Sequence, residues 1–249
     1  MRKLTQTHNR FFVRTSLQDL ERVRIEHETA SQITNVLRLE PDDVISLLDG
    51  SGKEYTAVLE KVSGSCVEAR IISSIQLETE LNIDLTVAIG RPKHPKVEII
   101  IQKCTEIGVS HFITFECTRS IGDIPDLKRI SRWQKIAIEA VEQCGGAVVP
   151  SIVTISSLDQ LITSFSEYDL ILLAHEQDIY PPLNKVYTDN QNRMPSGTSI
   201  MLITGPEGGF NDIEADKLIN AGAKPVNLGK RILRAETAAI IGATLIAAS

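Results

Sequence analysis

Apolar residues in the first 75 positions come in short runs that are separated by turn residues. The runs predict four strands and one helix-like segment, at residues 11–14, 28–37, 44–48, 54–61 and 65–73. The segment DGSG at residues 49–52 supplies turn chemistry between two of the strands. Several short strands in so small a space favour a small barrel. The polar run QLETE at residues 76–80 is then expected to be a linker.

From residue 83 onward the pattern changes, and predicted strands alternate with predicted helices. The strands are expected at residues 84–89, 111–116, 151–155, 170–174, 199–204 and 225–228. The helices are expected at residues 95–107, 127–143, 158–165, 212–221 and 235–247. Continuous apolar runs such as LILLA at residues 170–174 are typical of strands buried on both faces of a parallel sheet. The chain is therefore predicted to hold a β-rich domain over residues 1–75 and an α/β domain over residues 82–249.

Composition excludes several classes of protein. With 249 residues, 42% of them hydrophobic and 23% charged, the chain is typical of soluble globular proteins and not of disordered or fibrous ones. No apolar run reaches the roughly 18 residues that a membrane-spanning helix needs, and the N-terminus lacks the apolar segment of a signal peptide. The four cysteines have no CxxC spacing, so we expect neither a metal site nor a disulfide framework. A cytoplasmic protein without a membrane partner is expected.

Charge is distributed unevenly along the chain. The formal net charge is −6, yet residues 1–38 carry +3 and residues 39–80 carry −6. Two further basic clusters lie within residues 91–103 and 119–135. A negatively charged protein can hold a nucleic acid in a local basic groove. Charge alone leaves that possibility open beside ordinary solvated surfaces.

The segment IMLITGPEGGF at residues 200–210 runs from an apolar strand into a glycine-rich turn. A helix follows, and Asn211 and Glu214 have the spacing of a capping box at its start. Open α/β sheets bind ligands at the carboxyl ends of their strands, and glycines let the backbone approach a ligand closely. Neither a Walker A sequence nor a GxGxxG fingerprint follows a predicted strand. The segment favours a ligand site that is neither a phosphate loop nor a dinucleotide fold.

A second segment, LGKRILRAETAA at residues 228–239, also runs from a strand through a glycine into a helix. Cationic side chains and a carboxylate meet at the junction. The helix that follows is apolar nearly all round, which indicates burial on several sides or a subunit interface.

Together these two segments resemble the signature of the RsmE family of 16S rRNA uridine-N3 methyltransferases, in the SPOUT superfamily. Five further segments, all earlier in the chain, occur in the family's order. They are NVLRL, QKCTEIGV, RWQKI, EAVEQCG and VP, at residues 35–39, 102–109, 132–136, 139–145 and 149–150. The resemblance covers nearly the whole chain. The chain departs from the family pattern at Gly146, where an Arg is usual, and near Asn35, where a His is usual.

The resemblance implies an α/β fold of the SPOUT α/β-knot type, in which helices cover a parallel sheet and the C-terminal part forms a deep trefoil knot. It also implies a PUA-like β-barrel at the N-terminus that binds RNA. S-adenosylmethionine (SAM) is the implied methyl donor, and 16S rRNA or the small ribosomal subunit is the implied partner. The expected product is N3-methyluridine at position 1498 in customary rRNA numbering, made by a homodimer that pairs through the knotted domain.

Three strand ends are predicted to meet around the cofactor, at residues 173–176, 204–209 and 228–233. Apolar side chains there would enclose the adenine while backbone groups read its polar edge. The residues assigned to the cofactor are Leu173, Ala174, His175, Ile203, Thr204, Gly205, Glu207, Gly208, Gly209, Leu228, Gly229, Ile232 and Leu233.

Three residues at the start of the last helix are assigned to catalysis. N3 of uridine is protonated at neutral pH, so methyl transfer needs a base and stabilisation of the charge on the uracil oxygens. We assign Arg234 to that stabilisation. Glu236 is either the base or an acidic residue that complements the helix dipole, and Thr237 is either a cap or a hydroxyl donor.

Basic residues of both predicted domains are assigned to RNA binding, because contacts with phosphates need cations. They are Arg10, Arg14, Arg38, Lys103, Arg119, Arg132 and Lys135. Trp133 lies in an amphipathic helix and is expected in the core, with stacking on a base as the alternative.

Two other functions stay open at this point. One is a SPOUT methyltransferase that acts on another RNA or on a ribose 2′-OH. The other is a non-catalytic RNA-binding protein of ribosome assembly, although the intact GPEGG and LRAET segments argue against a lost cofactor site.

Overall fold

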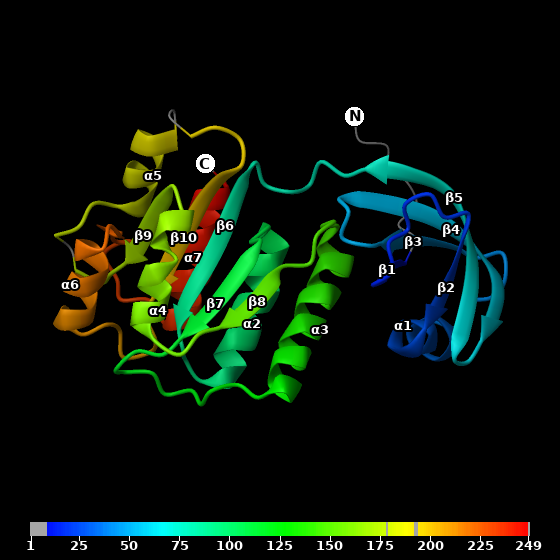
Figure 1. Ribbon diagram of the computed structural model, residues 1–249, viewed down its shortest axis with the longest axis horizontal. Coiled ribbons are helices and arrows are strands. Elements are labelled where there is room, and N and C mark those ends of the chain that lie inside the picture. The colour runs from blue at the N-terminus through cyan, green and yellow to red at the C-terminus, as the bar shows by residue number, and fades with distance from the viewer. Residues whose placement is uncertain (1–8, 178, 192–193, 249) are drawn as a thin grey trace. The chain divides into compact units, whose positions relative to one another are not determined.

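The computed structural model describes residues 9–177, 179–191 and 194–248, and the chain divides into two compact units (Figure 1). The first unit comprises Met1–Glu80 and Val141–Val149, and the second comprises Leu81–Ala140 and Pro150–Ser249. Each is described by itself.

The first unit is built on a five-stranded sheet in the order β1-β3-β4-β5-β2. Its strands are β1 (Arg10–Phe12), β2 (Arg22–Glu26), β3 (Val44–Leu48), β4 (Lys53–Ser63) and β5 (Cys66–Gln76). Strand β1 runs parallel to β3, and the other neighbours are antiparallel. A short helix α1 (His27–Ser31) continues directly into a π-helix, η1 (Gln32–Val36).

Alternation along the strands gives this sheet one apolar face. In β2, Val23 and Ile25 are buried and the residues between and beside them are exposed. They join a core to which Phe11, Ile33 and Leu59 also contribute. Period-two burial of this kind fits a sheet with one face in the core and one in water.

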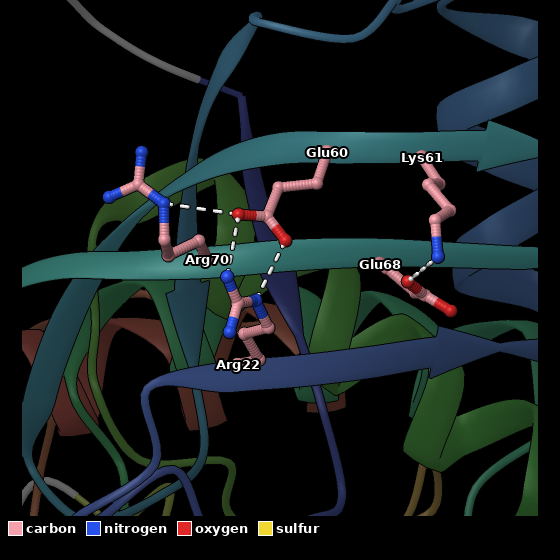
Figure 2. Close-up of polar contacts among 5 residues, drawn as sticks. All are labelled: Arg22, Glu60, Lys61, Glu68 and Arg70. Atoms are coloured by element: carbon pink, nitrogen blue, oxygen red, sulfur yellow. Dashed lines mark hydrogen bonds and ion pairs between the residues drawn. The ribbon is translucent and has the colours of Figure 1, made fainter.

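The other face of this sheet carries ion pairs that join β2, β4 and β5 (Figure 2). Glu60 on β4 pairs with Arg22 on β2 at 2.9 Å and with Arg70 on β5 at 3.1 Å. Lys61 and Glu68 pair at 2.8 Å. Exposed pairs like these contribute little stability. Charged side chains beside the edge strand β2 do protect that edge from pairing with other strands.

The second unit is built on a six-stranded sheet in the order β11-β9-β10-β6-β7-β8, and all of its pairings are parallel. The strands are β6 (Ile83–Gly90), β7 (His111–Phe115), β8 (Ser151–Thr154), β9 (Leu170–Ala174), β10 (Thr198–Thr204) and β11 (Lys224–Val226). The helices are α2 (His94–Ile107), α3 (Leu127–Cys144), α4 (Leu158–Thr163), α5 (Leu183–Gln191), α6 (Asp212–Asn220) and α7 (Ala235–Ala247), with a 3₁₀ turn η2 (Phe165–Glu167).

Helices cover both faces of the parallel sheet. Met201 and Ile203 of β10 belong to a core cluster with residues of α4 and α6. Leu202, which lies between them in the strand, contacts α7, where a Cβ on Gly242 would stand 2.7 Å from Leu202 Cδ2. Since successive strand side chains point to opposite faces, α7 lies on the face opposite α4 and α6. Helix α7 also packs against α2 (Figure 1).

Most elements predicted from the sequence are present. The six strands and five of the six helices in the described part of the second unit begin and end within two residues of their predicted bounds, if η2 is counted with α4. The capping box at Asn211 is confirmed, because its side chain accepts the Glu214 N–H at 2.8 Å while the Glu214 carboxylate accepts the Asn211 N–H at 3.2 Å. Trp133 is fully buried, so it belongs to the core.

Three predictions for the elements were incomplete or wrong. The single helix expected at residues 28–37 is a short α-helix followed by a π-helix, and β2 and α5 were not predicted. The linker expected at residues 76–80 begins inside β5. Among the described residues, no helix is long and apolar enough to cross a membrane.

Candidate active site

A pocket lies at the carboxyl ends of β9, β10 and β11. The pocket is partly open to solvent. Three segments form its wall, at residues 174–176, 205–210 and 228–238. The two segments singled out in the sequence, GPEGGF and LGKRILRAETAA, therefore lie together in space.

Nine of the thirteen residues assigned to the cofactor line this pocket: Ala174, His175, Gly205, Glu207, Gly209, Leu228, Gly229, Ile232 and Leu233. Leu173, Ile203 and Thr204 are buried in the strand ends behind it. Gly208 is exposed and is not part of the lining.

Sequence reasoning missed six lining residues: Glu176, Pro206, Phe210, Arg231, Ala235 and Ala238. Glu176, Pro206 and Arg231 lie inside the three predicted ranges, and Phe210, Ala235 and Ala238 lie one to five residues beyond them. The sequence therefore identified the segments, but it did not show which of their side chains face the pocket.

Close backbone approach fixes the glycine-rich turn. A Cβ on Gly90, the last residue of β6, would stand 2.8 Å from Pro206 Cδ and 3.1 Å from Pro206 N. Gly209 has a φ of +64°, a conformation that favours glycine. Phe210 stacks on Phe115 of β7 with ring centroids 6.3 Å apart. The turn is thus set by contacts with β6 and β7 as well as by its own sequence.

Arg119 holds the same turn from the loop after β7. Its Nη1 donates to Gly208 O at 2.7 Å and to Phe210 O at 3.4 Å. A Cβ on Gly208 would stand 3.1 Å from Arg119 Cβ. The missing side chain at position 208 therefore makes room for Arg119, whereas the sequence had suggested that it makes room for the ligand.

Glu207 is held by the start of α2. The Lys93 N–H donates to Glu207 Oε1 at 3.1 Å, and Lys96 Nζ lies 3.3 Å from the same oxygen. Burial would raise the pKa of Glu207, but hydrogen bonds from its own N–H, Lys93 and Lys96 outweigh burial and lower it. The carboxylate is therefore ionised at neutral pH.

Lys96 also reaches Glu236 in the first turn of α7, with Nζ 3.1 Å from Glu236 Oε2. Burial would lower the pKa of Lys96, but hydrogen bonds to Glu236 and Glu207 outweigh it and raise that pKa. The side chain is a stable ammonium ion between two carboxyl groups.

Arg234 is the N-cap residue of α7 and lies between two residues that line the pocket, Leu233 and Ala235. Its side chain is exposed and, among the described residues, has no hydrogen bond or ion pair. Thr237 is half-buried in the first turn of the same helix. A guanidinium without a partner beside a pocket is available to a ligand or substrate.

His175 lines the pocket but has partners of its own. Its ring packs edge-on against Tyr180 at 5.5 Å, and Nδ1 accepts the Gln177 N–H at 3.3 Å. These contacts favour a role in shaping the wall.

The residues assigned to RNA binding differ in what surrounds them. Arg10 pairs with Glu54 at 2.9 Å, Lys103 with Glu106 at 2.8 Å and Arg132 with Glu98 at 2.8 Å. Arg14 and Arg38 are exposed and have no ion pair within the described part of the chain, and Lys135 is exposed. Arg119 is bound to the glycine-rich turn, as described above.

The pocket suits a ligand with an apolar ring and polar groups, such as SAM. Leu228, Ile232 and Leu233 supply apolar surface. Glu207 Oε2 is buried without a hydrogen-bond partner among the described residues. Unpaired buried polar atoms are costly, so a ligand that brings hydrogen-bond donors fits this wall. No group of His, Cys, Asp and Glu residues in the described ranges has the arrangement of a metal site.

Two protein-family comparisons match the chain. Residues 79–247 match the RNA methyltransferase domain, and residues 33–72 match the RNA methyltransferase PUA domain. The prediction of a PUA-like N-terminal domain is thereby confirmed.

Named relatives and solved structures agree with these matches. Ribosomal RNA small subunit methyltransferase E of Bacillus subtilis is 32% identical over 243 residues, which is 95% of each chain. The enzyme of the same name from Neisseria gonorrhoeae, solved bound to S-adenosyl methionine, is 30% identical with a TM-score of 0.83 over 95% of each chain. A putative methyltransferase of Legionella pneumophila, solved with SAM, is 28% identical with a TM-score of 0.85 over 97% of each chain.

Proposed function

The chain belongs to the ribosomal RNA small subunit methyltransferase E (RsmE) family, and on that premise we propose that it methylates N3 of a uridine in 16S rRNA. It is a SAM-dependent rRNA methyltransferase. The observation that carries the proposal is the meeting of three strand-end segments around one pocket, with the unpartnered Arg234 beside it.

SAM supplies an already activated methyl group, so the protein has to position the cofactor and the uridine and to stabilise the charge that develops on the uracil. Residues 174–176, 205–210 and 228–233 hold the cofactor in this proposal. Arg234 stabilises the negative charge that develops on the uracil oxygens once the N3 proton leaves. A donor of this kind contributes roughly 10²–10³-fold to the rate.

The ion pair of Glu236 with Lys96 favours a structural role for this acid over the role of general base. A carboxylate that already faces an ammonium is a weaker proton acceptor than a free one. Thr237 lies one residue further along α7 and keeps its proposed role as a hydroxyl donor near the pocket.

The two units have separate roles in this proposal. Residues 1–75 bind RNA, with Arg14 and Arg38 as cations that have no ion pair among the described residues and can contact phosphates. Residues 82–249 bind SAM and carry out the transfer, and their C-terminal part is expected to be knotted.

We also propose a homodimer that acts in the cytoplasm. The apolar α7, with Ile241 at 39% exposure, supports pairing through this domain. Light scattering of the purified chain tests it, with twice the mass of one chain as the expected result and the mass of one chain as the contradiction.

Nucleoside mass spectrometry tests the base and the position. Small subunits from cells that lack the protein are incubated with SAM and the purified chain, and the 16S rRNA is digested. We expect 3-methyluridine to appear in one fragment. A 2′-O-methylated nucleoside would favour the ribose alternative, and SAM binding without any methylated nucleoside would favour a non-catalytic assembly protein.

A further inference from the structure

Lys96 connects two parts of the pocket that are far apart in the sequence. It projects from the first turn of α2 and lies 3.3 Å from Glu207 in the glycine-rich turn and 3.1 Å from Glu236 in α7. Its side chain is 26% exposed, and those of Glu207 and Glu236 are 19% and 16% exposed. The stability that such shielded ion pairs contribute depends on their geometry far more than that of exposed pairs does.

The first of these contacts is reinforced by the helix itself. The Glu207 carboxylate accepts the N–H of Lys93, the N-cap residue of α2, whose own side chain makes no capping hydrogen bond. A carboxylate at a helix N-terminus is stabilised by the free N–H groups and by the helix dipole. Glu207 is therefore fixed to α2 at two points, and the glycine-rich turn is fixed with it.

The second contact fixes the other side of the site. Glu236 is two residues after Arg234, in the first turn of α7. Helix α2 packs along α7, so Lys96 holds the end of α7 that carries Arg234 against the same helix that holds Glu207. Removing Lys96 would leave two shielded carboxylates close together without a cation, and these would repel one another.

We propose that Lys96 is a positioning residue with two arms: through Glu207 it sets the cofactor turn, and through Glu236 it sets the catalytic Arg234. This inference rests on the proposed function of the pocket. It assigns different kinetic consequences to the two carboxylates, which a general loss of stability would not produce.

Three variants separate the arms: Glu207→Gln, Glu236→Gln and Lys96→Met. We expect Glu207→Gln to weaken SAM binding about tenfold by isothermal titration with little change in kcat at saturating SAM. Glu236→Gln should lower kcat about tenfold with SAM affinity within twofold of wild type. Lys96→Met should show both defects, because small displacements of positioning groups are costly to catalysis.

A double variant tests whether Lys96 and Glu236 act as one unit. The kcat of Lys96→Met/Glu236→Gln should equal that of Lys96→Met, since residues of one network are not additive. Glu106→Gln removes a carboxylate from an exposed ion pair on the same helix and should change neither quantity.

The inference is overturned if the kcat losses of Lys96→Met and Glu236→Gln multiply in the double variant, or if Lys96→Met changes neither SAM affinity nor kcat. Equal loss of both quantities in each single carboxylate variant would also contradict it. If Lys96→Met fails to fold, as judged by circular dichroism, the two carboxylate variants still test the inference, because one should weaken only SAM binding and the other should lower only kcat. A wild-type chain that binds SAM but methylates no RNA would contradict the proposed function instead. The effect of Glu207→Gln on SAM affinity could still be measured in that case.

Discussion

Cations around the pocket differ in whether they already have a partner. Arg119 and Lys96 are bound to the glycine-rich turn. Arg234 has no partner in the described part of the chain, although it stands between two lining residues. The first two therefore maintain the site, and Arg234, like Arg231 in the pocket lining, has no partner among the described residues and is free to act there.

Arg234→Ala should reduce turnover by at least about 10²-fold, because the stabilisation of the uracil oxyanion would be lost. SAM affinity should stay within twofold of wild type, since the side chain is exposed and does not line the pocket. Single-turnover methyl transfer and isothermal titration measure the two quantities. Full turnover with normal binding of cofactor and RNA would show that the assigned role is wrong.

His94 gives the protein a pH-dependent contribution to stability. The His94 Nε2 accepts a hydrogen bond from Arg129 Nη1 at 2.6 Å, which needs the neutral ring. Burial, followed by the charge of Arg129, lowers the pKa of His94 below its ordinary value of 6.5. The folded protein therefore binds fewer protons than the unfolded chain just below pH 6.5, and stability falls as the pH falls through that region.

Urea unfolding at pH 7.5 and pH 5.5 tests this. The free energy of unfolding should fall less between the two values for His94→Gln than for wild type. His27→Gln is the matched control, because that ring is almost fully exposed. An unchanged pH dependence in His94→Gln would remove His94 from the explanation.

At the scale of elements, the position of the glycine-rich turn depends on how close β6 comes to it. Gly90→Ala would add a Cβ 2.8 Å from Pro206 Cδ and 3.1 Å from Cys117 Sγ. We expect a loss of about 1–3 kcal/mol in the free energy of unfolding, as for other overpacked sites, together with weaker SAM binding.

Gly64→Ala is the control for that substitution. Gly64 lies in the turn between β4 and β5, and a Cβ there would have no neighbour within 4 Å. Denaturant unfolding and SAM titration of both variants give the comparison. Equal stability and equal SAM affinity for the two variants would contradict the close-approach argument.

The sequence predicted the elements whose cause is local. The apolar run at residues 170–174 is typical of a buried strand. The capping box at the start of α6 is formed by Asn211 and Glu214, which are only three residues apart. Helix α5 was missed because its sequence LNKVYTDNQ is mostly polar. Strand β2 was missed because its exposed face is charged. Of those charges, Arg22 finds its partner Glu60 on the distant β4, while Arg24 pairs with Glu26 on β2 itself.

The candidate site was predictable to the same extent. Two of the three wall segments carry their signal in glycines at strand ends, and the third directly follows the apolar run of β9, so all three were found. From the sequence, Lys96 was only a member of a basic cluster and Arg119 was assigned to RNA binding, because their partners lie more than 80 residues away along the chain. Contacts between residues so far apart in the sequence arise when α2 and the loop after β7 pack in the fold, and a local sequence pattern does not predict that packing.

At the scale of the whole molecule, RNA binding should depend on which cations are free. Arg14→Ala and Arg38→Ala should each weaken binding to 16S rRNA fragments and reduce the slope of log K against log salt by about 1. Filter binding at several salt concentrations measures both quantities.

Arg22→Ala is the matched control in the same unit. Arg22 already pairs with Glu60, beside Arg70 on the next strand (Figure 2). Its removal should leave RNA affinity within about twofold of wild type, since its charge is largely neutralised. A larger effect from Arg22 than from Arg14 or Arg38 would place the RNA on the ion-paired face of the sheet.

The central claim is that three strand ends and Arg234 bring a methyl donor to a uridine. The most direct measurement incubates unmodified small subunits with methyl-deuterated SAM and either the wild-type chain or Arg234→Ala, followed by mass mapping of the nucleosides. We predict labelled 3-methyluridine with the wild-type chain and at most about one hundredth of its rate with Arg234→Ala. Labelled ribose, or equal labelling by both proteins, would contradict the claim.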